Sequence, residues 1–404
     1  MQTLSPVGHR IETNLVVEGA RTFLSGGKAS CLHAALTQPV DWIAVERIAD
    51  FHSVMPMLAC VLKEQGGSLV PREILERLQH RFLLIARSNL VRLQEWRRIL
   101  LAFETAGISV ISLKGPALAL QAYGDVALRE FTDLDLLIRP DDVLKARDTL
   151  MREGYRLRFS VAGNDIAWLR SRNQQWDFVN EGRGTVIDLH WGALHGMFPF
   201  QLPVHQLFES AQAEHCGGIP FLSLSPELLL IYLCAHGTKH CWLTLRSLCD
   251  VACHVRMAKE LGWELCIRQT EAAGCDLVLK HSLLLAQQVL GLELPSHIEN
   301  YCDSAKARAL ADAASSLLFR EDGNVGYGEG LRFHLGFAES RSNRARLMFE
   351  RVFIPEEQDW QTVHLPHSLQ FLYYAVRPIR FIVERLSKTT LQPRAEEWSA
   401  KELH

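Results

Sequence analysis

Two short segments decide the fold: Leu113-Lys114-Gly115, and Phe131-Thr132-Asp133-Leu134-Asp135-Leu136-Leu137-Ile138. An apolar run ends at the first segment, and the second begins after a stretch about one helix long. Side chains of an extended strand alternate between its two faces, so Asp133 and Asp135 share one face. Leu134, Leu136 and Ile138 share the other face, which we expect to enter a core.

The two aspartates indicate a metal site. Carboxylates held side by side repel each other unless a positive charge lies between them. A third acid, Asp188, lies in the run Thr185 to Trp191, which is typical of another short strand. An acid in such a strand is costly to bury unless it is paired or bound to a metal. Because Mg²⁺ commonly binds one or two carboxylates together with substrate phosphates, we expect Asp133, Asp135 and Asp188 to hold Mg²⁺ or Mn²⁺.

The order of strand, Lys-Gly turn, helix, Asp-Leu-Asp strand and later Asp strand resembles the nucleotidyltransferase superfamily that includes DNA polymerase β. The middle of the chain more closely resembles a family of uncharacterised bacterial nucleotidyltransferases. The matching motifs are Leu113 to Ala117, Tyr123, Arg129, Asp133 to Leu137, Gly154-Tyr155, Ile187 to Trp191, His236 to His240 and Leu372 to Pro378. The resemblance implies an α+β fold, in which a polymerase-β-like sheet with helices is flanked by N-terminal and larger C-terminal helical regions.

The resemblance also implies a reaction, the transfer of a nucleoside monophosphate from an NTP to a non-polymeric acceptor. ATP is the expected donor, and the acceptor is a small molecule, a sugar, a peptide or a protein. In a two-metal mechanism Asp133 and Asp135 would bind the metals and the triphosphate, and Asp188 would take the proton of the acceptor. The rival hypothesis is a nucleotide-binding regulatory or toxin–antitoxin-like module with little or no catalysis. Pro116, where the superfamily often has Ser, slightly favours the rival.

Two residues of the turn, and Arg129 shortly before Asp133, are candidates for nucleotide binding. Gly115 either lets backbone amides approach a phosphate or simply permits a tight turn. Lys114 either reaches the phosphate or forms an ion pair. Arg129 carries a planar fork that suits phosphate, and its alternative is a salt bridge with Asp125 or Glu130.

A second polar group lies in a region that is otherwise apolar and helical. His236, Lys239 and His240 are candidates for holding the nucleotide or the acceptor, and Arg246 and Asp250 follow them. His236 and His240 are four residues apart, so they share one helix face. The alternative is a structural polar network between helices.

Metal ligands other than carboxylates are also present. His190 shares the face of Asp188, either beside the site or as a buried hydrogen-bonded histidine. The ten cysteines include no Cys-x-x-Cys pair and are expected to be reduced and mostly buried. A zinc site joining His236 and His240 with a cysteine remains an alternative, although the spacing matches no standard structural zinc site. The candidate cysteines are Cys241, Cys249 and Cys253.

Composition narrows the class of partners. The 404 residues carry a formal net charge of −3, which gives no electrostatic signal for nucleic acid. No apolar run approaches the roughly 20 residues that cross a bilayer, and the first residues do not resemble a signal peptide. We therefore expect a cytoplasmic protein with no membrane partner.

The pattern of elements divides the chain into three parts. These are an N-terminal helical region (1–106), the catalytic core (107–222) and a C-terminal helical domain (223–404). Expected strands of the core are 109–113, 133–138, about 155–159, 175–180 and 185–190, and its expected helices are 116–122 and 141–152. We also expect a helix capped by Asp41, a long helix from Pro71 to Gly107 and a helix stop at Pro378. Residues 1–30 are expected to be loosely ordered, and residues 323–330 to form a loop.

Overall fold

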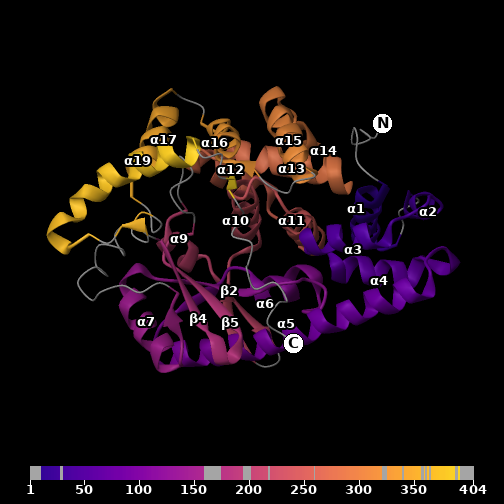
Figure 1. Ribbon diagram of the computed structural model, residues 1–404, viewed down its shortest axis with the longest axis horizontal. Helices are drawn as coiled ribbons and strands as arrows, with labels where there is room; N and C mark the ends of the chain where they lie inside the picture. The colour runs from indigo at the N-terminus through magenta and orange to yellow at the C-terminus, as the bar shows by residue number, and fades with distance from the viewer. Residues whose placement is uncertain are drawn as a thin grey trace.

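The structure is a computed structural model in which one mixed sheet is surrounded by helices (Figure 1). It describes residues 11–27, 31–158, 174–193, 202–216, 219–258, 260–320, 325–338, 341–355, 359, 362–363, 365–386 and 390–391. This mixed α+β architecture confirms the expected fold class.

The sheet contains seven strands in the described ranges. Their order across the sheet is β3 (Arg156–Leu157), β4 (Gln175–Asn180), β5 (Thr185–His190), β2 (Asp133–Ile138), β1 (Val110–Ser112), β7 (Ile219–Ser223) and β6 (Gln212–Cys216). β2 runs parallel to β5 and β1 parallel to β7, whereas the other neighbours are antiparallel. The first five strands agree with the expected ones to within a residue or two, although position 159 lies outside the described residues. β6 and β7 were not among the expected strands, although both lie at the end of the expected core (107–222).

One face of the sheet is apolar, as the alternation in β2 predicts. Leu134, Leu136 and Ile138 are fully buried. They belong to one cluster with Trp96 of α5 (Arg72–Thr105) and with side chains of α7 (Val143–Arg152). α5 is a single helix of 34 residues that begins directly after Pro71, as expected, and runs beneath the sheet in Figure 1.

In the described residues, four α-helices precede α5: α1 (Ile11–Leu24), α2 (Cys31–Leu36), α3 (Trp42–Phe51) and α4 (Met55–Gln65). Asp41 caps α3 as expected, because its side chain accepts hydrogen bonds from the amides of Ile43 and Ala44. The expectation that residues 1–30 are loose is wrong for α1. Its Leu15 and Val16 are buried, and the Arg21 side chain donates to the carbonyl of Val289, so tertiary contacts stabilise this helix.

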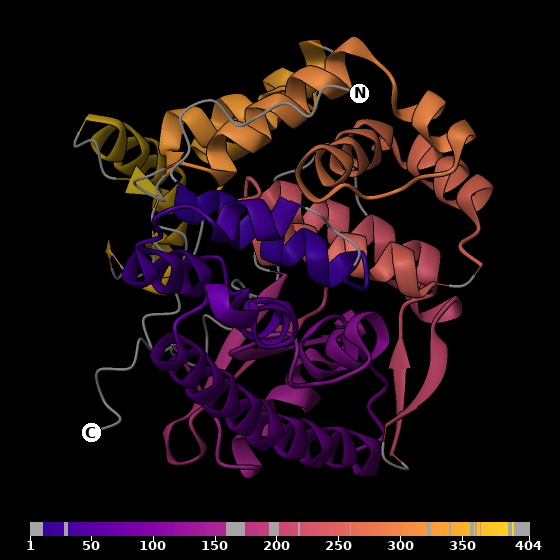
Figure 2. The same ribbon diagram turned by 90° about the vertical axis from the view of Figure 1, so that its right-hand side faces the viewer.

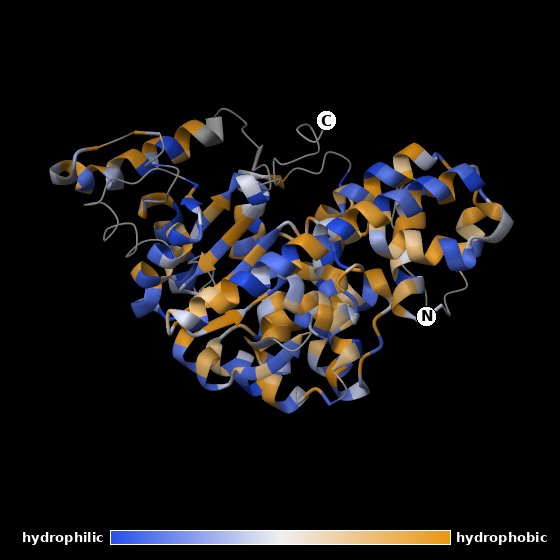
Figure 3. Ribbon diagram, turned by 90° about the horizontal axis from the view of Figure 1, so that it is seen from below, coloured by the Kyte–Doolittle hydropathy of each residue, from blue (hydrophilic) through white to orange (hydrophobic). Residues whose placement is uncertain are grey.

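Helices from the second half of the chain lie on the side of the opposite, polar face of the sheet. These are α10 (Pro226–Lys239), α11 (Leu245–Met257), α12 (Trp263–Ala273), α13 (Asp276–Leu290), α14 (Ser296–Cys302) and α15 (Ala305–Leu318). Of these, α10 and α11 lie nearer to the strands than α14 and α15 (Figures 1 and 2). One hydrophobic cluster runs from α1 through these helices. Seen from below in Figure 3, most helices carry both blue and orange stretches, as expected of helices that bury one face.

The last part contains β8 (Val325–Gly326), α16 (Tyr327–Leu335), α17 (Arg341–Phe353), the 3₁₀ segment His367–Leu372, α19 (Tyr373–Leu386) and β9 (Thr390–Leu391). The loop expected at 323–330 is therefore wrong from 325 onward, because β8 pairs with β9 and α16 follows. Pro378 lies inside α19 and does not end it. The buried side chains of Tyr373 and Phe381 anchor the helix on both sides of this proline. In the described ranges, no helix combines the length and apolar character needed to cross a bilayer.

Candidate active site

Three neighbouring strands bring acids together on the polar face of the sheet. Asp135 of β2 lies opposite Asp188 of the parallel strand β5. Asp188 in turn lies opposite Asp177 of the antiparallel strand β4. Paired positions of neighbouring strands point to the same face, and Asp133, two residues before Asp135, shares that face. The polar face therefore carries four carboxylates across three strands.

Asp135 is the best-buried of the predicted acids, at 5 % exposed. The ammonium nitrogen of Lys114 lies 3.1 Å from its Oδ2, and His190 Nε2 lies 3.3 Å from its Oδ1. Burial alone would raise the pKa of this carboxyl, but Lys114 and His190 hold it well below the usual range. Asp135 is therefore ionised, and both of its oxygens have a positive or polar neighbour.

Asp188 has the opposite electrostatic environment. Burial, followed by the charges of Asp177, Asp133 and Asp135, raises the pKa of Asp188 well above its usual range. A carboxylate that is buried beside other carboxylates is destabilised unless a proton or a cation neutralises its charge. The site therefore attracts positive charge at Asp188.

A metal ion could bridge these groups. Ligand atoms of Asp135, Asp188 and His190 all lie within 4.8 Å of one another. Carboxylate oxygens suit Mg²⁺ and Mn²⁺, and imidazole nitrogen is compatible with Mn²⁺ and other transition metals. Asp133 is not one of these three, so the close group contains two of the three expected ligands together with His190. The residues present fit a divalent cation.

The turn between β1 and the first core helix lies against the Asp133 strand. Gly115 has φ +59°, a conformation that L side chains rarely adopt. A Cβ at this position would lie 3.3 Å from the carbonyl oxygen of Asp133. Helix α6 (Gly115–Leu118) starts at this glycine and continues as a π-helical turn, Ala119–Tyr123. Both the tight turn and the close approach of backbone to β2 thus require glycine.

The α10 helix supplies the opposite wall of the site. His236 Nε2 lies 2.9 Å from Lys114 Nζ, so the expected second polar group adjoins the first. Burial, then the charge of Lys114, lowers the pKa of His236 well below its usual range, which keeps the imidazole neutral. The ring of His240 lies 4.5 Å from that of His236, and His240 is exposed at the helix end beside Lys239.

Arg129 forms its ion pair with a residue that the sequence analysis did not consider as its partner. Its Nε and Nη2 donate to the two oxygens of Asp250 in α11, at 2.7 and 2.8 Å. The hydroxyl of Tyr123 also donates to Asp250, at 2.7 Å. The salt bridge to Asp125 or Glu130 is therefore wrong, because a partner 121 residues away takes the guanidinium fork. This buried pair connects the core to the C-terminal helices.

Among the described residues, no cluster of ligand atoms matches the zinc alternative. Over the residues that the structure describes, the acidic group with His190 is the one cluster of three or more possible metal ligands. Cys241 lies 3.7 Å from His334, and burial raises the pKa of Cys253 and Cys249 above their usual range.

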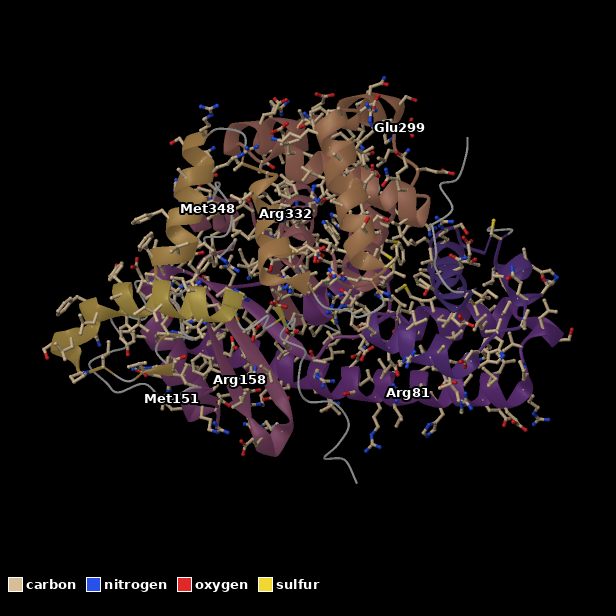
Figure 4. The ribbon with its side chains drawn as sticks, turned by 45° about the horizontal axis from the view of Figure 1, so that its top comes forward. Arg81, Met151, Arg158, Glu299, Arg332 and Met348 are labelled. Carbon is tan, nitrogen blue, oxygen red and sulfur yellow. The ribbon has the colours of Figure 1, made fainter. Side chains whose placement is uncertain are left out.

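Asp177 is a site residue that sequence reasoning missed. It is buried, and Gln175 donates to its Oδ1 at 3.2 Å. Arg158, labelled in Figure 4, lies beside these strands with Nη1 3.9 Å from Asp177 Oδ2. The alternation of Trp176 and Phe178 around it was a usable signal, since it places Asp177 on the polar face of a predicted strand.

Comparison with known proteins agrees with this geometry. Residues 38–291 match the model of a protein family described as "uncharacterised nucleotidyltransferase". The match includes β1, β2, β5 and α10, and therefore every residue of the candidate site. No curated protein and no solved structure matches the chain.

Proposed function

We propose a function from the premise that this match establishes: the chain belongs to the family of uncharacterised nucleotidyltransferases, since the matched region spans more than half of it. The proposed reaction uses an NTP, with ATP as the expected donor. An acceptor oxygen attacks the α-phosphorus, the bond from that phosphorus to the bridging oxygen breaks, and pyrophosphate leaves. The acceptor oxygen loses its proton and carries the nucleoside monophosphate.

The pairing of Asp135 with Asp188 across β2 and β5 carries this proposal. Together with Asp133 they would hold Mg²⁺ or Mn²⁺, which would neutralise the charge that develops on the attacking and leaving oxygens. Asp135 is ionised, so its carboxylate can bind a cation. Asp188, with its high proton affinity, would take the proton of the acceptor as general base.

In the proposal, the phosphates are contacted from two sides, by the turn after β1 and by α10. Lys114 is only 11 % exposed and lies between Asp135 and His236, so its ammonium group can turn from the carboxylate to a phosphate oxygen. The amide of Gly115 adjoins it at the turn. His236, Lys239 and His240 would complete the nucleotide contacts from α10.

The proposed acceptor is not a polymer. A protein that follows a nucleic-acid chain needs a basic surface to neutralise phosphates, and the whole chain has a formal net charge of −3. The acceptor class is therefore proposed as a small molecule, a sugar, a peptide or a protein side chain.

The test is a calorimetric titration of ATP, GTP, CTP and UTP with Mg²⁺ into the wild type and into Asp133→Asn/Asp135→Asn. We expect metal-dependent binding of at least one nucleotide, lost in the double variant. The matched control is Asp276→Asn, because Asp276 pairs with Lys280 on α13 rather than in the site. Binding that survives in the double variant would overturn the assignment of the carboxylates.

A second assay separates the enzyme from its rival, the nucleotide-binding regulatory module. Pyrophosphate release is followed with each bound NTP and a panel of hydroxyl and amine acceptors. Release that depends on an acceptor and disappears in Asp188→Asn supports the transferase. Metal-dependent NTP binding without release for any acceptor would favour the regulatory module.

A further inference from the structure

The imidazole of His190 lies among the acids of the candidate site. His190 and Asp188 are two residues apart in β5, so their side chains share the polar face of the sheet. In the register of the two parallel strands, Asp188 pairs with Asp135, and His190 pairs with Leu137, two residues further along β2. His190 is 8 % exposed and Asp135 is 5 % exposed. A buried imidazole nitrogen therefore accompanies the two carboxylates that the strands bring together.

The distances among these three groups suit the ligands of a single ion. One ligand atom from each of Asp135, Asp188 and His190 lies within 4.8 Å of the other two. His190 Nε2 is 3.3 Å from Asp135 Oδ1, whereas most N–H···O hydrogen bonds measure about 2.9–3.0 Å. Two ligand atoms at 2.1 Å from one ion, at right angles or at the tetrahedral angle, are about 3.0–3.4 Å apart. The nitrogen and the oxygen are thus already separated as a shared cation requires.

An imidazole ligand changes which ion a site prefers. Mg²⁺ takes oxygen ligands and gives up its waters reluctantly. Divalent ions of the first transition series bind imidazole nitrogen as well as carboxylate oxygen, and Mn²⁺ is generally the weakest binder of that series. A site of two carboxylates and one imidazole should therefore hold Mn²⁺, and the later ions of the series, more tightly than Mg²⁺.

We propose that His190 Nε2 is a ligand of the bound ion, together with Asp135 and Asp188, and that the site therefore selects a divalent transition-metal ion over Mg²⁺. The inference rests on the proposed function, because it takes these carboxylates to be the metal site of the transferase, and it names the class of cofactor. Nε2 binds the ion as part of a neutral imidazole, so the ring carries its proton on Nδ1. The ion then lies between the nitrogen and the Asp135 carboxylate that face each other in the free protein.

The first test uses Mn²⁺ as a paramagnetic probe of its own ligands. The full-length protein is loaded with MnCl₂, with and without inorganic tripolyphosphate, and bound Mn²⁺ is examined by pulsed electron paramagnetic resonance. Tripolyphosphate supplies phosphate oxygens but contains no nitrogen, so any nitrogen coupling comes from the protein. We expect the coupling of one directly bound imidazole nitrogen in the wild type and its loss in His190→Gln. His190→Asn is measured as a second variant in case His190→Gln does not fold.

The second test separates a metal ligand from a packing residue. Glutamine keeps a hydrogen-bond donor near Asp135, but the ligand atom it offers is an amide oxygen. Dissociation constants are measured for Mn²⁺, from the loss of its free-ion signal, and for Mg²⁺, from competition with Mn²⁺. We expect the wild type to bind Mn²⁺ more tightly than Mg²⁺, and this preference to fall about tenfold or more in His190→Gln. A histidine that only packs would weaken both ions alike.

His254→Gln is the matched control. His254 is also buried, at 5 % exposed, and its Nε2 lies 2.8 Å from the carbonyl oxygen of Pro226. Pro226 begins α10, about 15 Å along the helix from His236, which adjoins the site. We expect a lower melting temperature for this variant, with the nitrogen coupling and the preference for Mn²⁺ unchanged.

Each other outcome overturns the inference in a recognisable way. Bound Mn²⁺ without nitrogen coupling in the wild type would exclude His190 as a ligand and leave the carboxylate site intact. Coupling that persists in His190→Gln would assign the nitrogen to another residue. Tighter binding of Mg²⁺ by the wild type, or an unchanged preference in the variant, would refute the selection of a transition-metal ion. If Mn²⁺ binds neither with nor without tripolyphosphate, the proposed function fails together with the inference.

Discussion

Lys114 and His190 hold the two oxygens of one carboxylate: Lys114 Nζ lies 3.1 Å from Asp135 Oδ2, and His190 Nε2 lies 3.3 Å from Oδ1. The ammonium group therefore stabilises the ionised acid in the free protein. In the proposed reaction the same group has a second partner, the phosphate. Its replacement should affect both stability and binding.

Lys114→Met should destabilise the protein by about 3 kcal/mol at pH 7, because it leaves a buried carboxylate without its cation. The sign follows from Asp135, whose pKa is lowered in the folded wild type. The wild type keeps this stabilisation above the ordinary aspartate value, near 3.8, and loses it as the pH falls below that value. The deficit of the variant should therefore shrink below about pH 4. Urea unfolding at pH 7 and pH 3 measures it.

Lys280→Met is the control for that experiment. Lys280 pairs with Asp276 at 2.8 Å on a less buried surface, so its loss should cost about 1 kcal/mol or less. A deficit of Lys114→Met that is equally small would contradict the buried pairing with Asp135.

Asp188→Asn should raise the melting temperature of the free protein at pH 7. The pKa of Asp188 is raised in the folded state, so the wild type loses stability as the pH climbs above the unfolded value. The difference in melting temperature should consequently be small near pH 4 and grow toward pH 7. Millimolar Mg²⁺ should narrow it by stabilising only the wild type. A lower melting temperature for the variant at pH 7 without metal would refute the crowding of charges around Asp188.

Gly115→Ala should lower both stability and nucleotide binding. The alanine is strained at φ +59°, by about 1–2 kcal/mol, and its Cβ presses on the backbone of Asp133. Gly124→Ala is the control, because that position has φ +75° but open space around the added carbon. Similar stability losses, with weakened Mg²⁺-ATP binding in Gly115→Ala alone, are expected in melting and calorimetry. Equal binding by the two variants would show that the turn does not position β2.

Arg129→Met and Asp250→Asn should each lower the free energy of unfolding by about 3–5 kcal/mol, because each variant leaves the other member of the ion pair buried without its partner. The double variant should be less destabilised than the sum of the two, giving a coupling energy above about 1 kcal/mol. Urea unfolding of the four proteins provides the cycle. Additive losses would mean that the two residues act independently.

Much of the sheet could be predicted from the sequence because its signals are local. The alternation around Asp133 and Asp135, and the β-branched run before Asp188, define strands without knowledge of their neighbours. Asp177 was missed because its place in the site depends on the register of β4 against β5.

Contacts between distant segments could not be predicted either, because they also depend on the tertiary structure rather than on local sequence. The partner of Arg129 lies 121 residues away in α11, whereas sequence reasoning considered only its neighbours. Residues 1–30 were taken as loose because they contain Gly and Ser and are weakly patterned, whereas α1 is stabilised by contacts with distant residues such as Val289. Pro378 was taken as a stop because the usual cost of proline inside a helix is high, and here buried contacts on both sides offset it.

The contact between Arg21 and Val289 has a consequence for the folding of the chain during its synthesis at the ribosome. The two residues are 268 positions apart, and Arg21 Nε donates to the carbonyl of Val289 at 2.6 Å. At roughly 5–20 residues per second, translation takes on the order of 10 to 50 s to deliver the second partner after the first. Until then, the surface of α1 that belongs against α13 stays uncovered at the ribosome. We expect nascent chains stopped before residue 290 to recruit chaperones through this helix.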